Sequence, residues 1–344
     1  MCIRDSLEQV EIEVIVPKMM YGVLKLFANV SKINLNVRHH YDFSSIHLPL
    51  SHMLRDPAAL HSLSVVTTNS NMTVLLRGLT GLQELSIQLY RNVDGIPTDS
   101  LIDCFNESQN LAKLKITGYW YDKHDVEVRK VFHHLPCSLK ELTLEGIHLD
   151  DDDIKALSER ANCLNHLSSL SLSWNNITGV GISLLANTLK LHEALHSLHI
   201  SGNPVQSDDG IEALAQLTTL EALHVEQCDF TSSGLRMLVN ALKLNVNLHT
   251  LALTVSDDAN IEPLINMTNL KDLFLHDGSY HHEPTSKRTS SDKRSLLKIL
   301  EHLNQLKKLR FYSNCHGWSN NDKLEIISKA FLQTQVEDIM ICEI

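Results

Sequence analysis

A nine-residue pattern of apolar and polar positions recurs along the chain. Its first, fourth and sixth positions carry leucine or a similar aliphatic residue, and its ninth carries Asn or Cys. The clearest copies are LSSLSLSWN from Leu167, LHSLHISGN from Leu195, LEALHVEQC from Leu220 and LKKLRFYSN from Leu306. Apolar and polar residues alternate within each copy, which predicts a short strand with one buried face. Tandem copies of such a unit predict a solenoid whose inner face binds another macromolecule.

The pattern can be followed through thirteen copies. Neighbouring copies lie 28 residues apart from Leu111 to Leu195, and the spacing elsewhere ranges from 22 to 36 residues. A single repeat domain over residues 1–344 is therefore expected, most regular over 139–253. The first positions of the copies are Leu7, Val30, Leu60, Leu82, Leu111, Leu139, Leu167, Leu195, Leu220, Leu248, Leu270, Leu306 and Val336.

Each predicted strand is followed by a polar cluster and then by an apolar stripe with helical spacing. After Asp150–Asp153, for example, the stripe consists of Ile154, Leu157 and Ala161. Ser, Thr and Asp accept hydrogen bonds from the unpaired N–H groups of a first helical turn, so Asp150–Asp153 predicts a helix cap. A calcium loop would need the order D-x-D-x-D-G, which Ile154 interrupts. Each copy thus predicts a strand, a turn and a helix.

The ninth position of the pattern has a structural role. Asn175, Asn203 and Asn314 stand where the chain leaves a strand and must turn, and Cys228 fills the same slot. A side-chain amide there can pair with backbone groups that the turn would otherwise leave unsatisfied inside the solenoid. We expect these four residues to form a turn ladder.

The helices open with Gly-Ile or Gly-Leu pairs, at Gly181-Ile182, Gly210-Ile211 and Gly234-Leu235. Together with the 28-residue spacing, these pairs make the unit resemble the ribonuclease-inhibitor-type leucine-rich repeat. The resemblance implies an α/β horseshoe with parallel strands on the concave face and helices on the convex face. This repeat type is similar to that of the sensor arrays of animal NOD-like receptors, of ribonuclease inhibitor and of Ran GTPase-activating proteins.

Two stretches depart from the repeat. The segment 277–295 is polar and charged and lengthens its copy to 36 residues, so we expect a loop on one face of the array. It is either a tolerated flexible insertion or a binding or phosphorylation loop, since Ser and Thr residues lie there among basic ones. The last copy stops at Ile344 on a predicted strand with no helix to cover it, and we expect the chain to be a fragment of a longer protein.

Composition limits the class of partner and the cellular compartment that we expect. The formal net charge of −11 argues against a nucleic acid or an anionic membrane as the partner. No apolar run is long enough to predict a membrane span. The seven cysteines are scattered and form no C-x-x-C pair, which favours reduced thiols in a cytoplasmic protein.

One segment matches the H-E-x-x-H signature of zinc proteases, from His192 to His196. That chemistry needs both histidines on one face of a continuous helix. The copy from Leu248 places Asn245-Val246-Asn247-Leu248-His249 at the same position, which is the predicted turn from helix to strand. We therefore expect no protease site here.

Strand residues that face inward are the best candidates for partner binding, because aromatic and Arg side chains dominate the binding energy of interfaces. His199 and His224 occupy one column on adjacent predicted strands, about 5 Å apart. Such a pair could bind a metal or act as a pH-sensitive contact, but among twenty histidines an incidental pair is the preferred interpretation. Trp174 could instead pack over a neighbouring loop. We expect the site to comprise Trp174, His199, His224, Glu226, Phe274, His276, Arg310 and Tyr312, with no metal ion or cofactor.

The sequence therefore favours a non-enzymatic module that binds a protein on its concave face, with neither nucleic acid nor membrane as partner. The resemblance implies the ligand-sensing or autoinhibitory repeat region of a cytosolic NOD-like receptor of innate immunity. A free-standing inhibitor similar to ribonuclease inhibitor is one alternative. A Ran-type GTPase-activating protein is another, although the acidic tail usual in that class is absent from this sequence.

Overall fold

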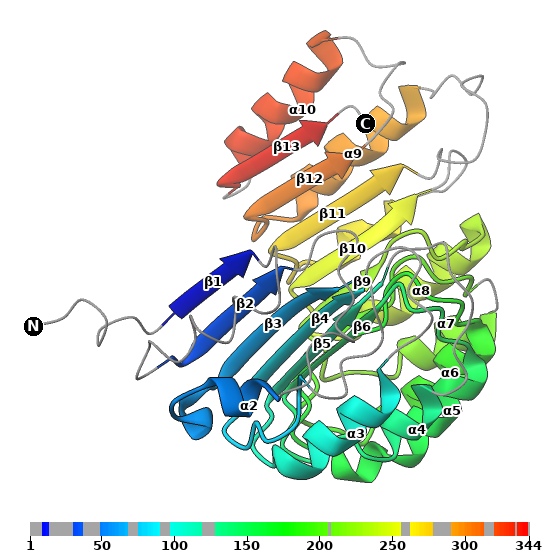
Figure 1. Cartoon of the computed structure of the whole chain (residues 1–344). Coiled ribbons are helices and arrows are strands. Elements are labelled where there is room, and N and C mark those ends of the chain that lie inside the picture. Colours follow the sequence, from blue (N-terminus) through cyan, green and yellow to red (C-terminus); the bar gives the residue numbers. More distant parts are fainter. Residues whose placement is uncertain are drawn as a thin grey trace, which may run out of the picture. The chain divides into compact units, whose positions relative to one another are not determined.

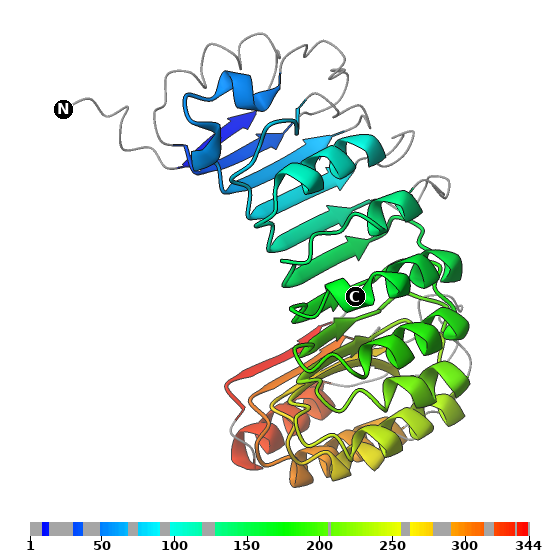
Figure 2. The same ribbon diagram turned by 90° about the horizontal axis from the view of Figure 1, so that it is seen from below.

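The computed structural model describes eleven stretches of the chain: residues 9–13, 30–36, 49–67, 75–89, 97–118, 128–205, 208–255, 262–277, 290–312, 320–333 and 336–342. They fall into two compact units, Met1–Asn175 and Asn176–Ile344. Within each unit a strand, a turn and a short helix recur along the chain, as Figures 1 and 2 show. The expected single domain over residues 1–344 stays a prediction.

The strands of each unit are parallel and pair in chain order. The first unit contains β1 (Gln9–Glu13), β2 (Lys32–Asn36), β3 (Ser62–Thr67), β4 (Glu84–Leu89), β5 (Lys113–Thr117), β6 (Glu141–Glu145) and β7 (Ser169–Ser171). The second contains β8 (Ser197–His199), β9 (Ala222–Val225), β10 (Thr250–Val255), β11 (Asp272–Asp277), β12 (Lys308–Tyr312) and β13 (Asp338–Cys342). Each of these thirteen strands begins two residues after the first position of a predicted copy. The leucine-rich-repeat solenoid is thereby confirmed copy by copy.

Helices lie on one side of the strands in each unit (Figures 1 and 2). Short 3₁₀-helices accompany them, either after an α-helix or, between β10 and β11, as the one helix that the structure describes. The first unit has α2 (Leu50–Met53), η3 (Pro57–Ala59), α3 (Thr98–Glu107), α4 (Val128–Phe132), α5 (Asp151–Glu159) and η4 (Ala161–Cys163). The second has α6 (Gly179–Leu189), α7 (Asp208–Leu214), α8 (Ser232–Leu242), η5 (Glu262–Asn266), α9 (Ser290–His302) and α10 (Asn320–Gln333).

The core lies between the strands and the helices. In the copy from Leu167, the leucines at the first, fourth and sixth positions are all buried. Leu170 pairs in register with Leu142 of the preceding strand, so equivalent leucines form continuous ladders. Full burial of one leucine side chain stabilises the fold by about 1.5–3 kcal/mol, and this term recurs in every repeat. The leucine ladders therefore fix which strand residues point away from the core.

The acidic run before α5 caps that helix, as predicted. Asp150 accepts from the N–H of Asp153, and the Asp153 carboxylate accepts from the N–H of Asp150. Arg129 of the preceding repeat lies against both carboxylates, with Nε 2.8 Å from Asp153 Oδ1. The cap therefore also joins neighbouring repeats.

The segment 277–295 is not a loop throughout. Helix α9 begins at Ser290, so the last six residues of that segment form its first turns. Residues 278–289 lie outside the described part of the chain. The apolar residues Leu296, Ile299 and Leu300 are buried, and they begin six residues after the polar start of α9.

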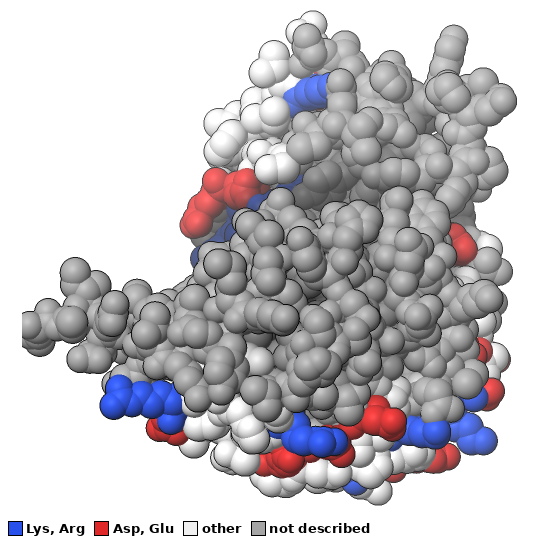
Figure 3. Space-filling view, in the orientation of Figure 1, with Lys and Arg blue, Asp and Glu red and all other residues white. Residues whose placement is uncertain are grey.

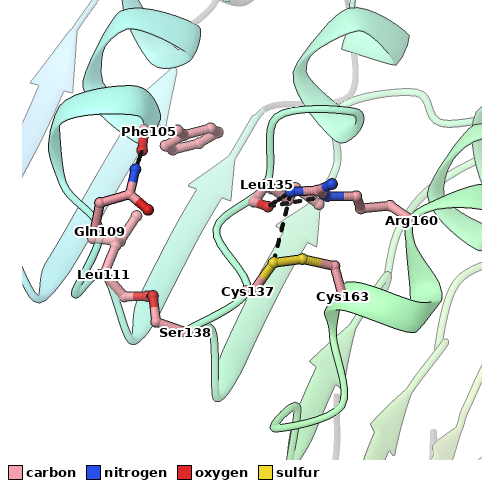
Figure 4. The surroundings of a disulfide bond; sticks show 8 residues. All are labelled: Phe105, Gln109, Leu111, Leu135, Cys137, Ser138, Arg160 and Cys163. Atoms are coloured by element: carbon pink, nitrogen blue, oxygen red, sulfur yellow. Dashed lines mark hydrogen bonds between the residues drawn. A yellow bond between two sulfur atoms is a disulfide. The ribbon is translucent and has the colours of Figure 1, made fainter.

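Reduced thiols were expected throughout, and this is wrong for two cysteines. Cys137 and Cys163 form a disulfide, with Cα atoms 4.8 Å apart (Figure 4). They lie 26 residues apart, close to the repeat length, so successive turns of the solenoid bring them side by side. Arg160 lies over the bond and donates to the Leu135 carbonyl. Cys104 and Cys228 are free and buried.

Candidate partner-binding site

The strand face opposite the leucine ladders carries the third, fifth and seventh positions of each copy, and we call it the open face. Along β4 and β6 its residues are half-buried or exposed, while the alternate residues are fully buried. In the first unit this face is polar. Lys113 lies between Glu84 and Glu141, with Nζ–Oε1 distances of 3.9 and 2.9 Å. The charges of the open face on β4 to β6 therefore compensate one another around Lys113.

The open face of the second unit carries a row of stacked planar groups, which we call the ring row: His199, His224, Phe274 and Arg310. The rings of His199 and His224 are nearly parallel, with centroids 4.0 Å apart. The ring of Phe274 follows at 6.1 Å from His224. The Arg310 guanidinium carbon lies 5.6 Å from the Phe274 centroid. Four of the predicted site residues are thus brought together.

Ala252 explains how rings on non-adjacent strands can approach each other. It stands on β10 between His224 of β9 and Phe274 of β11, in register with both. Two strand spacings separate those backbones by about 10 Å, yet the ring centroids are only 6.1 Å apart. Ala252 is 1% exposed, although its position faces away from the core. Its small side chain lets the two rings lean together over it.

Glu226 lies beside this row at the seventh position of β9's repeat. Its Oε2 is 4.0 Å from Nδ1 of His224, and its backbone N–H donates to Ser201 Oγ at 3.1 Å. Burial, aided by the charge of His199, lowers the pKa of His224 to about 4. Burial also raises the pKa of Glu226, partly offset by the hydrogen bond from Ser201. At neutral pH, His224 is therefore uncharged.

Arg310 ends the row in an ion pair that the sequence reasoning missed. Its guanidinium donates to Asp338 Oδ2 on β13 at 3.0 Å. Asp338 holds the third position of the copy that begins at Val336, so the rule that identified the other inward-facing residues would have found it. The pair holds the guanidinium near Phe274.

Three predicted site residues do not belong to this row. His276 is half-buried on β11, and its backbone pairs in register with Tyr312, whose side chain lies outside the described part of the structure. Trp174 lies in the first unit, in the turn after β7, and is 41% exposed. Its backbone has φ of 61°, in the left-handed region.

The expected turn ladder pairs with backbone groups of two successive repeats. Asn175 Oδ1 accepts from the N–H groups of Ile147 and Leu149, at 3.1 and 3.0 Å. Its Nδ2 donates to the carbonyls of Leu144 and Leu172. Asn203 makes the equivalent bonds in the second unit, accepting from Ile177 and donating to Ile200, and the Cys228 thiol donates to the same carbonyl of Ile200. Asn314 lies outside the described residues.

The protease-like segment has no helical geometry. Helix α6 ends at Leu189, before His192, and His192 is buried while His196 is exposed. Asn245, at the equivalent position, donates to the carbonyls of Leu217 and Leu220 at the start of the preceding strand's repeat unit. The position shared by His192 and Asn245 therefore has a structural role in the turn from helix to strand. Within the part of the chain that the structure describes, no group of three or more His, Cys, Asp or Glu residues is placed to hold a metal ion.

Comparison with known proteins agrees with this architecture. The family model described as "Leucine Rich repeat" matches residues 163–186 and 216–239. Ribonuclease inhibitor of Mus musculus is 31% identical over 125 residues, covering 34% of this chain and 27% of that protein. Protein NLRC5 of Ictalurus punctatus is 26% identical over 233 residues, covering 67% of this chain and 12% of that protein.

A third relative is the human NACHT, LRR and PYD domains-containing protein 5, 30% identical over 125 residues that make up 34% of this chain and 10% of that protein. The chain thus matches only a minor part of each relative, about a quarter or less of its length. It is a leucine-rich-repeat protein whose repeats resemble those of ribonuclease inhibitor and of NOD-like receptors. Among the described residues, no helix has the length and apolar character needed to cross a bilayer.

Proposed function

We propose that the chain is a non-enzymatic protein-binding module and that the ring row of the second unit is the centre of its binding surface. The observation that carries the proposal is the preorganised stack of His199, His224, Phe274 and Arg310 on the open face. Half-buried aromatic and Arg side chains held in fixed positions lose little entropy on binding, and they are the residue types that dominate interface energies.

The nature of the partner follows from the surface charges. Along the lower edge of the face drawn in Figure 3, described Lys and Arg side chains lie among Asp and Glu side chains. With a net charge of −11, such a surface suits a protein better than a nucleic acid. We therefore propose a protein partner on the concave face.

The finer proposal is that this array is the ligand-sensing or autoinhibitory repeat region of a cytoplasmic NOD-like receptor of innate immunity. It is supported by the similarity to Protein NLRC5, which extends over 67% of this chain. A free-standing inhibitor is the second candidate, supported by the similarity to ribonuclease inhibitor. In a ribonuclease assay the purified chain would inhibit the enzyme if the second candidate holds.

The experiment compares partner capture by three forms of the chain, with the captured protein identified and its binding then measured with purified components. Phe274→Ala removes the centre of the ring row, and we expect it to weaken binding by more than about tenfold, as hot-spot truncations do. Lys115→Ala is the matched control, because Lys115 is an exposed fifth-position residue of the first unit. Equal binding by the Phe274 variant and the wild type would refute the proposed surface.

A further inference from the structure

A pair of hydrogen-bond acceptors stands at the edge of the ring row. Glu226 Oε2 and His224 Nδ1 are 4.0 Å apart, too far to bond to each other. Ser201 Oγ donates to the same carboxylate oxygen at 3.4 Å. About a quarter of each of the two side chains, His224 and Glu226, is exposed. A donor arriving from solvent can therefore reach both acceptors.

Within the described part of the chain, no Lys or Arg side chain pairs with the Glu226 carboxylate. Among the described residues its one ion-pair contact is His224, and the lowered pKa of that imidazole keeps the ring neutral above about pH 4. A half-buried charge without a counter-charge costs free energy, and the raised pKa of Glu226 reflects that cost. A cation supplied by a partner would remove it.

The separation of the acceptors selects the kind of cation. An ammonium nitrogen placed at hydrogen-bonding distance from both acceptors would see them about 90° apart, close to the angle between two of its N–H bonds. The paired N–H groups of a guanidinium are parallel and match the two oxygens of one carboxylate. Acceptors 4.0 Å apart on two side chains therefore suit an ammonium better.

We propose that this corner of the open face is a docking site for a lysine side chain of the protein partner. The ammonium donates to Glu226 Oε2 and to Nδ1 of the Nε2-protonated tautomer of His224, and the aliphatic stem lies along the ring row. Charge complementarity supports this occupant, since the chain carries a net charge of −11. The inference rests on the proposed function, because it assigns one contact within the proposed binding surface.

The test is an NMR titration of the full chain with three blocked tripeptides, acetyl-Gly-X-Gly-amide, in which X is Lys, Arg or Nε-acetyl-Lys. We expect the Lys peptide to bind about tenfold more tightly than its acetylated form, because acetylation removes the charge and two donors. The Arg peptide falls between them. Binding of the Lys peptide should shift the His224 Nδ1 resonance, because this unprotonated nitrogen then accepts a hydrogen bond. Equal affinities for the Lys and acetylated peptides would overturn the proposal.

Two carboxylate variants separate a specific site from general charge attraction. Glu226→Gln is expected to weaken the Lys peptide about tenfold. Glu145→Gln removes the same charge at the seventh position of the repeat that begins at Leu139, where the neighbouring groups are hydroxyls rather than rings. It should change affinity less than about twofold. Equal losses in both variants would refute a specific site.

His224→Phe keeps a ring in the stack but removes the second acceptor. This variant too should bind the Lys peptide more weakly than the wild type does. Retention of full affinity by this variant would overturn the bridging geometry. The outcomes also distinguish this inference from the proposed function. If Phe274→Ala abolishes partner capture while the Lys peptide binds no better than its acetylated form, the lysine site fails and the binding surface stands.

Discussion

At the scale of single residues, the eighth position of the repeat has an unusual backbone. Gly146, Trp174, Gly202 and Gln227 all have positive φ, from 52° to 72°. Two of the four are glycines, which adopt this conformation without strain. A residue with a side chain pays about 1–2 kcal/mol for it. Trp174 and Gln227 therefore hold a conformation that the surrounding turn imposes.

Trp174 gives a direct test of that strain. We predict that Trp174→Gly is more stable than Trp174→Ala by about 1 kcal/mol, because both remove the indole and only glycine relieves the left-handed backbone. The measurement is the free energy of unfolding in urea. If the two variants have the same stability, the turn does not store the strain.

His224 makes stability depend on pH. Its pKa falls from 6.5 to about 4 on folding, mainly through burial. The unfolded chain therefore binds more protons between these values, so stability is fully present above about pH 6.5 and is lost as the pH falls through about 4. We predict a loss of about 3 kcal/mol over this window, since each pKa unit corresponds to about 1.4 kcal/mol.

The measurement is urea unfolding at several pH values for the wild type and for His224→Phe, which should lack this loss. The raised pKa of Glu226 acts in the opposite direction, because folding then favours its protonated form. The difference between the two proteins cancels that contribution to first order. An NMR titration that gives His224 a pKa near 6.5 would contradict the prediction.

At the scale of elements, the link between α4 and α5 depends on one buried carboxylate. The Asp153 side chain is fully buried and Arg129 is its charge partner. We predict that Arg129→Ala lowers the free energy of unfolding by about 2–3 kcal/mol, because it removes the cation paired with a buried carboxylate. Arg77→Ala is the control: its ion pair with Asp103 is about half exposed, and its loss should cost less than about 1 kcal/mol. Comparable losses would show that burial is not the deciding factor.

The disulfide between Cys137 and Cys163 is a second link between repeats. It closes a loop of 26 residues, which in the chain-entropy model stabilises the fold by about 3–4 kcal/mol. We predict that a reductant lowers the unfolding midpoint of the wild type and leaves the double variant Cys137→Ser/Cys163→Ser unchanged. Alkylation of thiols before and after reduction, followed by mass spectrometry, reports the oxidised fraction. A wild type insensitive to reductant would contradict the prediction.

The elements show where sequence reasoning succeeds. Strand positions follow from the leucines alone, because the first, fourth and sixth positions must face the core in every copy. The start of α9 was not predicted, because its first residues are polar and its buried stripe begins only at Leu296. The disulfide was missed because Cys137 and Cys163 lie outside the nine-residue pattern, which sets no register for them.

At the scale of the whole molecule, the repeat pattern predicts only part of the proposed binding surface. Strand pairing predicted that His199 and His224 are neighbours, since equivalent positions of successive copies lie side by side. It did not predict that Phe274 reaches them, which depends on the small size of Ala252 between them. Periodicity places side chains on a face, whereas contacts across two strands depend on side-chain volumes that the repeat leaves free.

A solenoid also confines damage to the neighbourhood of a mutation, because each repeat contacts only the next. We predict that Arg129→Ala speeds hydrogen exchange in peptides from β5 to β7 and leaves β10 to β13 unchanged. Asn245→Ala, which removes two hydrogen bonds to the carbonyls of Leu217 and Leu220, should do the reverse, speeding exchange around β9 and β10 and sparing β2 to β4. Both patterns are read by mass spectrometry of peptides. Faster exchange throughout both units in either variant would mean that the chain opens as one cooperative block, which nearest-neighbour coupling does not allow.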